Sequence, residues 1–231
     1  MTSIATDRTF EIGGVPHYLA RSVTPSTAGV LLLPHVYGAD EFCRDFADEL
    51  AGRGLTTLVW HPYPELGLGE PFGAERPPRR NDEAVMKILT DCIDAMHGKL
   101  GLTRFATLGF CMGARYSLLF GAREARLSAA VACYPSIPAK RSPGQDLEPL
   151  PAASQIACPV LVAYPGRDAV TPRPVFEALR DLLYGREAET TILFYPEAEH
   201  GFMHAKGEAN AAATKTARPQ VLAYLDTYLG G

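Results

Sequence analysis

Cys111 lies between two glycines in the stretch Gly109-Phe110-Cys111-Met112-Gly113. This G-x-C-x-G spacing is typical of a nucleophile elbow, a tight turn from a strand into a helix, with cysteine in place of the usual serine. In so tight a turn, larger side chains two positions before or after the nucleophile would collide. The turn would strain the cysteine backbone and expose the thiol at a helix N-terminus, where the dipole favours a thiolate. The alternative is a packed cysteine in an ordinary strand-to-helix turn.

Two residues that could complete a catalytic triad follow the cysteine along the chain. Asp168 lies in Gly166-Arg167-Asp168, and His200 begins His200-Gly201-Phe202; each stretch follows an apolar, strand-like run. In a triad of this kind the imidazole accepts the thiol proton, and the carboxylate orients the imidazole. Each residue also has an ordinary interpretation, as a turn aspartate and a loop histidine. The order nucleophile, acid, histidine at one end of a sheet favours the catalytic interpretation.

The elements that must position these residues alternate between strands and helices. Apolar runs predict strands over 28–33, 55–60, 104–110, 127–134, 159–164 and 190–195. Helical spacing predicts helices over 40–51, from 81 or 82 to about 98, and over 112–122, 174–183 and 209–228, the last bent or interrupted at Pro219. This order predicts an α/β fold with a mainly parallel sheet, helices on both faces and a site beyond the carboxyl ends of the strands.

Two proline-rich stretches, 61–80 and 135–154, interrupt this alternation of strands and helices. Both follow strands, so both are expected at the functional edge of the sheet, as loops that cover a substrate or as plain surface loops.

Composition limits the class of protein. The chain has 231 residues, 47% of them hydrophobic, which suits one globular domain over 1–231. The net charge of −4 argues against nucleic-acid and anionic-membrane partners. The N-terminus lacks the pattern of a signal peptide, so we expect a cytoplasmic protein. The five cysteines are widely spaced without a C-x-x-C pair, which predicts neither a disulfide framework nor a zinc site, and we expect no cofactor.

Together these motifs resemble those of the dienelactone hydrolase family of α/β-hydrolases, over nearly the whole chain. The resemblance implies an α/β-hydrolase fold with about eight strands and a triad of Cys111, Asp168 and His200. It also implies hydrolysis of a small ester or lactone, with the dienelactone of chloroaromatic breakdown as the type substrate.

The sequence departs from the family pattern at the expected substrate-binding positions. Where family members that act on dienelactone carry a glutamate beside the resting cysteine, the matching residue is His35. Where they carry an arginine four residues after the triad histidine, this chain has His204. A further arginine is expected after the second strand, where only Arg76, Arg79 and Arg80 are available. These changes leave the substrate open and retain the hydrolytic residues.

The expected mechanism is thiolate attack on an activated ester or lactone carbonyl, with a thioester intermediate. The backbone N–H groups of Met112 and Val36 are expected to hold the oxyanion. His35 could partner the thiolate, donate to substrate or face solvent. Candidate pocket residues, each following a strand end or a triad residue, are His35, Tyr37, Tyr63, Tyr134, Phe202 and His204.

Three other functions fit the same residues. The first is a broader carboxylesterase or thioesterase with the same triad. The second is a non-catalytic α/β-hydrolase scaffold that binds a small molecule. The third is a redox protein in which Cys133 acts as a resolving thiol for Cys111.

Overall fold

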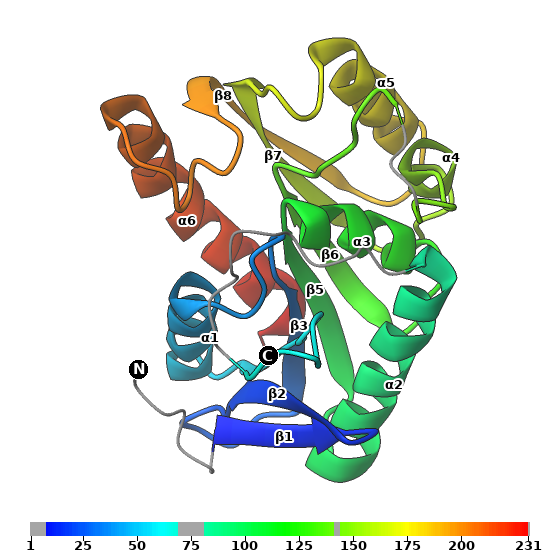
Figure 1. Ribbon diagram of the computed structural model, residues 1–231, viewed down its shortest axis with the longest axis vertical. Coiled ribbons are helices and arrows are strands. Elements are labelled where there is room, and N and C mark those ends of the chain that lie inside the picture. Colours follow the sequence, from blue (N-terminus) through cyan, green and yellow to red (C-terminus); the bar gives the residue numbers. More distant parts are fainter. Residues whose placement is uncertain (1–7, 69–80, 141–143, 231) are drawn as a thin grey trace.

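The computed structural model describes residues 8–68, 81–140 and 144–230. Its framework is an eight-stranded sheet with the order β1-β2-β4-β3-β5-β6-β7-β8 (Figure 1). The strands from β4 to β8 in this order run parallel, whereas β1 and β2 are antiparallel additions at one edge. The expected mainly parallel α/β fold is therefore confirmed.

The elements follow the predicted alternation closely. The parallel strands are β3 (Ala28–Leu33), β4 (Thr56–Val59), β5 (Arg104–Phe110), β6 (Leu127–Cys133), β7 (Val160–Arg167) and β8 (Thr190–Glu199). The helices are α1 (Glu41–Gly52), α2 (Asp82–Leu100), α3 (Met112–Gly121), α4 (Pro149–Ala153), α5 (Arg173–Tyr184) and α6 (Glu208–Leu229).

The first hairpin was not among the predicted elements. It consists of β1 (Thr9–Ile12) and β2 (Val15–Ala20), joined by the two-residue turn Gly13-Gly14. Both glycines have positive φ, as the tight turns of two-residue hairpins require. The β1 strand is short and half-exposed, so it lacks the apolar run that predicts a buried strand. The Gly-Gly pair is the feature of the sequence that could have predicted this hairpin.

Three other elements differ from expectation. Strand β8 continues to Glu199, so His200 follows it directly instead of lying in a loop that begins at residue 197. The proline-rich stretch 135–154 contains the short helix α4, since proline is tolerated in a first helical turn. Helix α6 runs through Pro219 without interruption.

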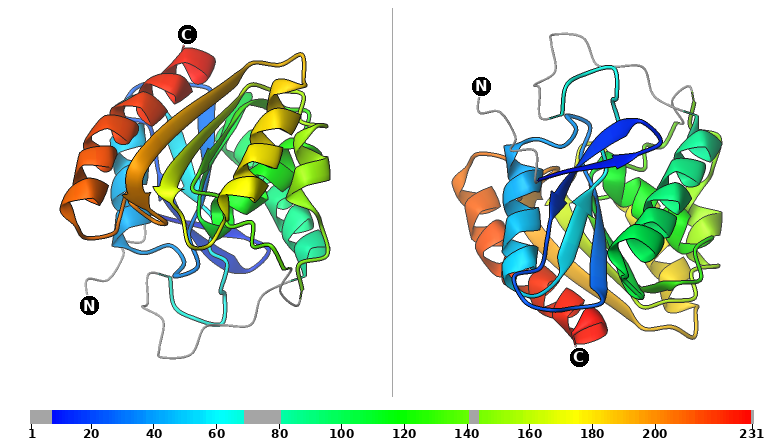
Figure 2. Two further views of the ribbon diagram at one scale, coloured as in Figure 1. Left: turned by 90° about the horizontal axis from the view of Figure 1, so that it is seen from above. Right: turned by 90° about the horizontal axis from the view of Figure 1, so that it is seen from below.

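The helices cover both faces of the sheet (Figure 2). Helices α1 and α6 lie on one face, and α2, α3, α4 and α5 lie on the other. Each face has its own buried apolar cluster, and the side chains of the central strands alternate between the two. The sheet is thus buried on both sides and forms a rigid base for residues at its carboxyl edge.

Helices α1 and α2 are capped by side chains at their first turns. The Asp40 carboxylate accepts a hydrogen bond from the Cys43 N–H at the start of α1. The Asn81 side chain accepts one from the Ala84 N–H at the start of α2. Both caps satisfy backbone donors that a helix leaves free in its first turn.

The elbow between β5 and α3 depends on two close backbone approaches. A Cβ atom at Gly109 would lie 2.3 Å from the Gly113 carbonyl oxygen. A Cβ atom at Gly113 would lie 2.0 Å from the carbonyl oxygen of Leu33, at the end of β3. Since these neighbours are backbone atoms, no side-chain rotation can relieve the collision. This explains the two glycines of the motif.

We predict that Gly113→Ala destabilises the protein by about 3 kcal/mol or more, because β3 or the elbow must move to admit the methyl group. Urea unfolding measures this change. Gly98→Ala is the matched control, because a Cβ atom there, in the last turn of α2, meets nothing within 4 Å. That control should gain about 0.5–1 kcal/mol. A Gly113→Ala variant as stable as wild type would contradict the close-approach argument.

Candidate active site

Cys111 stands at the junction of β5 and α3. Its backbone has φ 52° and ψ −108°, a conformation that strains a residue other than glycine. All five cysteines are free thiols, and Cys111 is the one that is not fully buried. The sulfur lies at the N-terminus of α3, where the helix dipole favours negative charge. The sequence prediction of an exposed thiol on a strained turn therefore agrees with this geometry.

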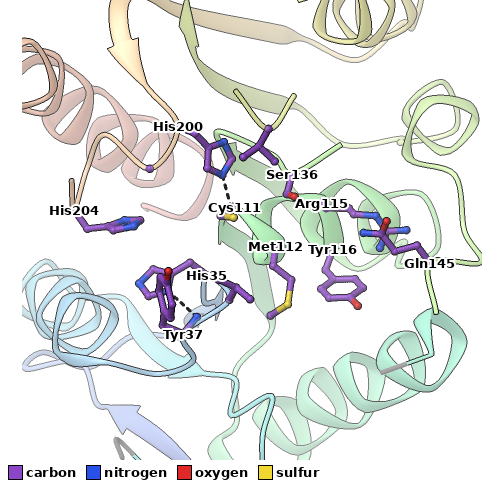
Figure 3. A pocket seen from close by; sticks show the side chains of 13 residues that line it. His35, Tyr37, Cys111, Met112, Arg115, Tyr116, Ser136, Gln145, His200 and His204 are labelled. Atoms are coloured by element: carbon purple, nitrogen blue, oxygen red, sulfur yellow. Dashed lines mark hydrogen bonds between the residues drawn. The ribbon is translucent and has the colours of Figure 1, made fainter. Parts of the chain in front are cut away.

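The structure brings Cys111, His200 and Asp168 together (Figure 3). His200 Nε2 lies 3.0 Å from Cys111 Sγ, and His200 Nδ1 lies 2.9 Å from Asp168 Oδ2. These three residues come from the ends of β5, β8 and β7, which meet at one edge of the sheet. The imidazole thus bridges a thiol and a carboxylate.

Asp168 is held by backbone donors as well as by the histidine. Its side chain is fully buried, and Oδ1 accepts hydrogen bonds from the N–H groups of Val170 and Thr171 at 2.7 and 2.9 Å. The Thr171 hydroxyl donates to the Pro135 carbonyl after β6. These bonds fix the carboxylate toward His200 and satisfy a charge that would be costly to bury alone.

The electrostatics of His200 favour the imidazolium. Burial lowers the pKa of His200, but the hydrogen bonds to Asp168 and Cys111 and their negative charges outweigh it and raise the pKa to about 9. At neutral pH the ring is therefore positively charged beside the sulfur, which stabilises a thiolate. Since 9 lies above the ordinary 6.5, this contribution to stability is present below about pH 6.5 and is lost as pH rises through about 9.

The elbow is bonded to the turn that follows β3. The Gly113 N–H donates to the Pro34 carbonyl at 3.1 Å, and the Tyr63 hydroxyl donates to the Val36 carbonyl at 3.1 Å. Met112 is the first residue of α3, so its N–H has no acceptor within the helix. The two residues expected to hold an oxyanion, Val36 and Met112, both line the same cavity as Cys111.

His35 is buried and does not face solvent. Its Nδ1 accepts a hydrogen bond from the Tyr37 N–H at 3.2 Å (Figure 3). Nε2 lies 3.1 Å from Asp40 Oδ2, although the two are poorly aligned for a hydrogen bond. Both ring nitrogens are thus directed at their own turn, and the ring presents carbon to the cavity.

His204 packs against His35, with ring centroids 4.5 Å apart. Burial, followed by the charge of His35, lowers the pKa of His204 to about 4, although Asp40 acts in the opposite direction. The Tyr134 hydroxyl lies 3.4 Å from His204 Nδ1. His204 is therefore neutral at physiological pH.

A cavity of about 260 Å³ opens at the thiol. Seven residues expected at the site line it: His35, Val36, Tyr37, Cys111, Met112, His200 and His204. Three other candidates need correction: Tyr63, Tyr134 and Phe202 are buried and support the cavity wall from behind. A residue just after a strand can face the core as easily as the site, so its position did not decide its direction.

Six lining residues were not predicted: Arg115, Tyr116, Ser136, Gln145, Val170 and Gly201. Arg115 follows the cysteine by four positions, and this helical spacing was the available signal. Ser136 and Gln145 come from the stretch 135–154, so part of that stretch lies beside the thiol as expected of a covering loop. Arg76, Arg79 and Arg80, and most of the other loop, 61–80, lie outside the described residues.

Within the described ranges, one group of side chains has the composition of a metal site: His35, Asp40 and Cys43, with ligand atoms within 4.8 Å of one another. Asp40 already caps α1, and burial raises the pKa of the Cys43 thiol well above its usual range. The positive end of the α1 dipole also disfavours a cation there. These residues therefore fit a structural role better than a metal site.

Comparisons with known proteins agree with this geometry. The sequence matches the dienelactone hydrolase family over residues 15–229. It is 28% identical to the carboxymethylenebutenolidase of Rhodococcus opacus over 220 residues, which cover 93% of this chain and 86% of that protein. It is also 28% identical to an Escherichia coli K12 protein over 184 residues, 75% of this chain. That match covers 66% of the E. coli protein, so the chain spans about two-thirds of it.

Solved structures show the same architecture. A Klebsiella pneumoniae protein, 26% identical, superposes with a TM-score of 0.76 over 92% of this chain and 93% of its own. An α/β-hydrolase from a Penicillium species, 14% identical, gives a TM-score of 0.73 over 96% of this chain and 98% of its own.

The fold defines the class: this is an α/β-hydrolase. The match over nearly the whole chain shows further that it belongs to the dienelactone hydrolase family, a family of ester and lactone hydrolases. The expected family is thus confirmed, and with it the enzyme class at the level of the family. In the part of the chain that the structure describes, no helix is both long and apolar enough to cross a membrane.

We predict that His200 titrates near pH 9 and that Asp168→Asn lowers this pKa by at least one unit, since an amide cannot stabilise the imidazolium as a carboxylate does. NMR of the imidazole nitrogens across pH 5–11 measures the midpoint. His200→Gln identifies the signal among the six histidines of the chain. A wild-type midpoint near 6.5, or one that Asp168→Asn leaves in place, would contradict the proposed electrostatics.

Proposed function

We propose that this protein hydrolyses a small activated ester or lactone, with Cys111 as nucleophile, His200 as general base and acid, and Asp168 as the group that orients His200. The observation that supports it most directly is the continuous contact from Cys111 Sγ through the His200 ring to the buried Asp168 carboxylate. A scaffold that only binds a ligand has no need for this contact. The family match supports the same reaction class.

In the first half of the reaction the Cys111 thiolate attacks the substrate carbonyl carbon, and its electron pair forms the carbon–sulfur bond. The carbonyl oxygen becomes an oxyanion that accepts hydrogen bonds from the Met112 and Val36 N–H groups. The His200 imidazolium donates its Nε2 proton to the leaving alkoxide as the carbon–oxygen bond breaks. A thioester on Cys111 remains, and the alcohol, or the opened end of a lactone, is released from the carbonyl.

In the second half, His200 acts as the base. Formation of the thioester removes the sulfur charge, which contributed to the raised pKa of His200, so this pKa falls and the ring can stay neutral and accept a proton from water. His200 accepts a proton from water, and the hydroxide attacks the thioester carbonyl. The carbon–sulfur bond breaks, and the carboxylic acid product leaves behind the thiolate–imidazolium pair.

A cysteine nucleophile restricts the leaving group. A thiolate is itself a good leaving group, so the tetrahedral intermediate collapses back to substrate unless the alkoxide leaves readily. Enol esters, aryl esters and strained or conjugated lactones meet this condition, and amides do not. The proposed function is therefore esterase or lactonase activity on activated substrates, and not peptidase activity.

The redox function needs a resolving thiol that can reach Cys111. Cys133, the candidate at the end of the neighbouring strand β6, is fully buried, and burial raises the pKa of its thiol. A buried neutral thiol is a poor attacking group in disulfide exchange. The buried position of Cys133 in the sheet therefore argues against it as a resolving thiol for Cys111.

We predict that Cys111→Ala and His200→Ala lower kcat/KM for 4-nitrophenyl acetate by at least about a thousandfold, because each removes a group that forms or breaks bonds. Asp168→Asn should cost about ten- to a thousandfold through loss of ring orientation. Stopped-flow or steady-state absorbance of nitrophenolate measures the rates.

Cys158→Ala is the matched control, since Cys158 is the least buried of the other four cysteines and does not line the cavity. It should retain wild-type activity. Unchanged turnover in Cys111→Ala would refute the nucleophile. Full activity in Asp168→Asn would refute the role given to the carboxylate.

A further inference from the structure

A second cavity lies beside the one that contains Cys111. It measures about 210 Å³, and the cavity at the thiol measures about 260 Å³. Arg115 and Gln145 line both cavities, so these two side chains form a wall between them, which we call the partition. The rest of the second cavity is largely apolar, with walls from Ile137, Pro138, Leu147, Pro149, Leu150 and Val175.

The chain that forms the second cavity starts at the nucleophile. The Ser136 N–H donates a hydrogen bond to the Cys111 carbonyl at 3.0 Å, and Ser136 lines the cavity at the thiol. The next residue, Ile137, lines the second cavity. The two cavities are therefore neighbours along the same stretch of backbone, within reach of one substrate.

The partition lies where the acyl group of a substrate would extend. In the mechanism proposed above, His200 donates a proton to the leaving alkoxide, so the leaving group lies beside His200. Figure 3 shows Arg115 and Gln145 across Cys111, away from His200. The acyl group on the attacked carbonyl carbon extends away from the leaving group, and thus toward the partition.

A buried ion pair fixes the partition. The two terminal nitrogens of Arg115 donate to the two Asp82 carboxylate oxygens at 2.8 and 2.7 Å, and both side chains are buried. The same two side chains hold Leu147, two residues after Gln145. The Leu147 N–H donates to Asp82 at 2.9 Å, and the Leu147 carbonyl accepts from Arg115 at 2.7 Å. Displacement of Arg115 would leave a buried carboxylate without its partner, which is strongly unfavourable.

We propose that Arg115 and Gln145 limit the length of the acyl group that this enzyme accepts, because the partition keeps long chains out of the second cavity. The proposal rests on the esterase or lactonase function proposed above and adds a pair of specificity-determining residues to it. A short acyl group fits the cavity at the thiol, whereas a long one has to displace the partition. Without the partition, an apolar chain would gain the apolar walls of the second cavity.

The test uses 4-nitrophenyl acetate, butyrate and octanoate, which share one leaving group. Rates are measured below the concentration at which the octanoate forms micelles and are divided by the rates of uncatalysed hydrolysis. We expect kcat/KM of the wild-type enzyme to be at least tenfold lower for the octanoate than for the butyrate. A wild-type enzyme that prefers the octanoate would overturn the proposal.

Gln145→Ala removes most of one side chain of the partition and should raise the ratio of octanoate to butyrate kcat/KM by at least tenfold. Gln155→Ala is the matched control, because Gln155 is an exposed glutamine that lines neither cavity. The control should keep the wild-type ratio within about twofold. A Gln145→Ala enzyme with the wild-type ratio would overturn the proposal.

Asp82→Asn tests the part played by the ion pair. It weakens the charge that holds Arg115 and should raise the same ratio by at least threefold. Glu83→Gln makes the same change in the exposed pair of Glu83 and Arg123, from the next residue of α2, and should keep the wild-type ratio. A folded Asp82→Asn enzyme with the wild-type ratio would contradict the role given to Asp82. If this variant does not fold, the result with Gln145→Ala decides the proposal.

Failure of the proposed function has a different result. In that case Cys111→Ala abolishes the hydrolysis of none of the three esters, and the inference fails together with the function. When the inference alone is wrong, turnover depends on Cys111, but the preference for acyl length does not respond to Gln145→Ala.

Discussion

The close packing of backbone at the β5–α3 elbow is the constraint on which the site depends. Gly113 lies against the end of β3 so closely that a single methyl group would overlap the Leu33 carbonyl oxygen. This contact forces the strained conformation of Cys111, exposes its sulfur at a helix N-terminus, and joins the elbow to the turn that contains Val36. The nucleophile and both proposed oxyanion donors are thereby placed by one packing interaction.

The parallel sheet positions the other two residues of the proposed triad. Strands β5, β7 and β8 end at the same edge of the sheet and place a thiol, a carboxylate and an imidazole there, although the three residues are far apart in the sequence. Backbone donors hold the buried Asp168 carboxylate in contact with His200. Contacts between side chains far apart in the sequence set the charge of the cavity wall, because Arg115 pairs with Asp82, and burial and His35 lower the pKa of His204.

Much of this arrangement could be predicted from the sequence, because it depends on patterns that are local. The apolar runs, the helical spacings and the glycines around Cys111 each report a local requirement of the backbone. The hairpin of β1 and β2 was not predicted, because its first strand is short and half-exposed and so lacks an apolar run. Gly13-Gly14 was its only strong signal.

Side-chain direction and long-range pairing were harder to predict. Tyr134 and Phe202 follow the expected strand end and triad residue, yet both point into the core. The Arg115–Asp82 pair joins two helices, and no spacing within either one predicts it. His35 has the expected position, but its nitrogens face its own turn, which a sequence pattern alone cannot specify.

The central claim is that acyl transfer passes through the Cys111 sulfur. Acid quench within milliseconds of mixing with a 4-nitrophenyl ester, followed by peptide mapping by mass spectrometry, tests it most directly. The account predicts that the peptide containing Cys111 gains the mass of the acyl group, and that the adduct disappears as substrate is exhausted. Turnover with the acyl group on another residue, or with no adduct at any time under conditions where acylation is faster than hydrolysis, would contradict it.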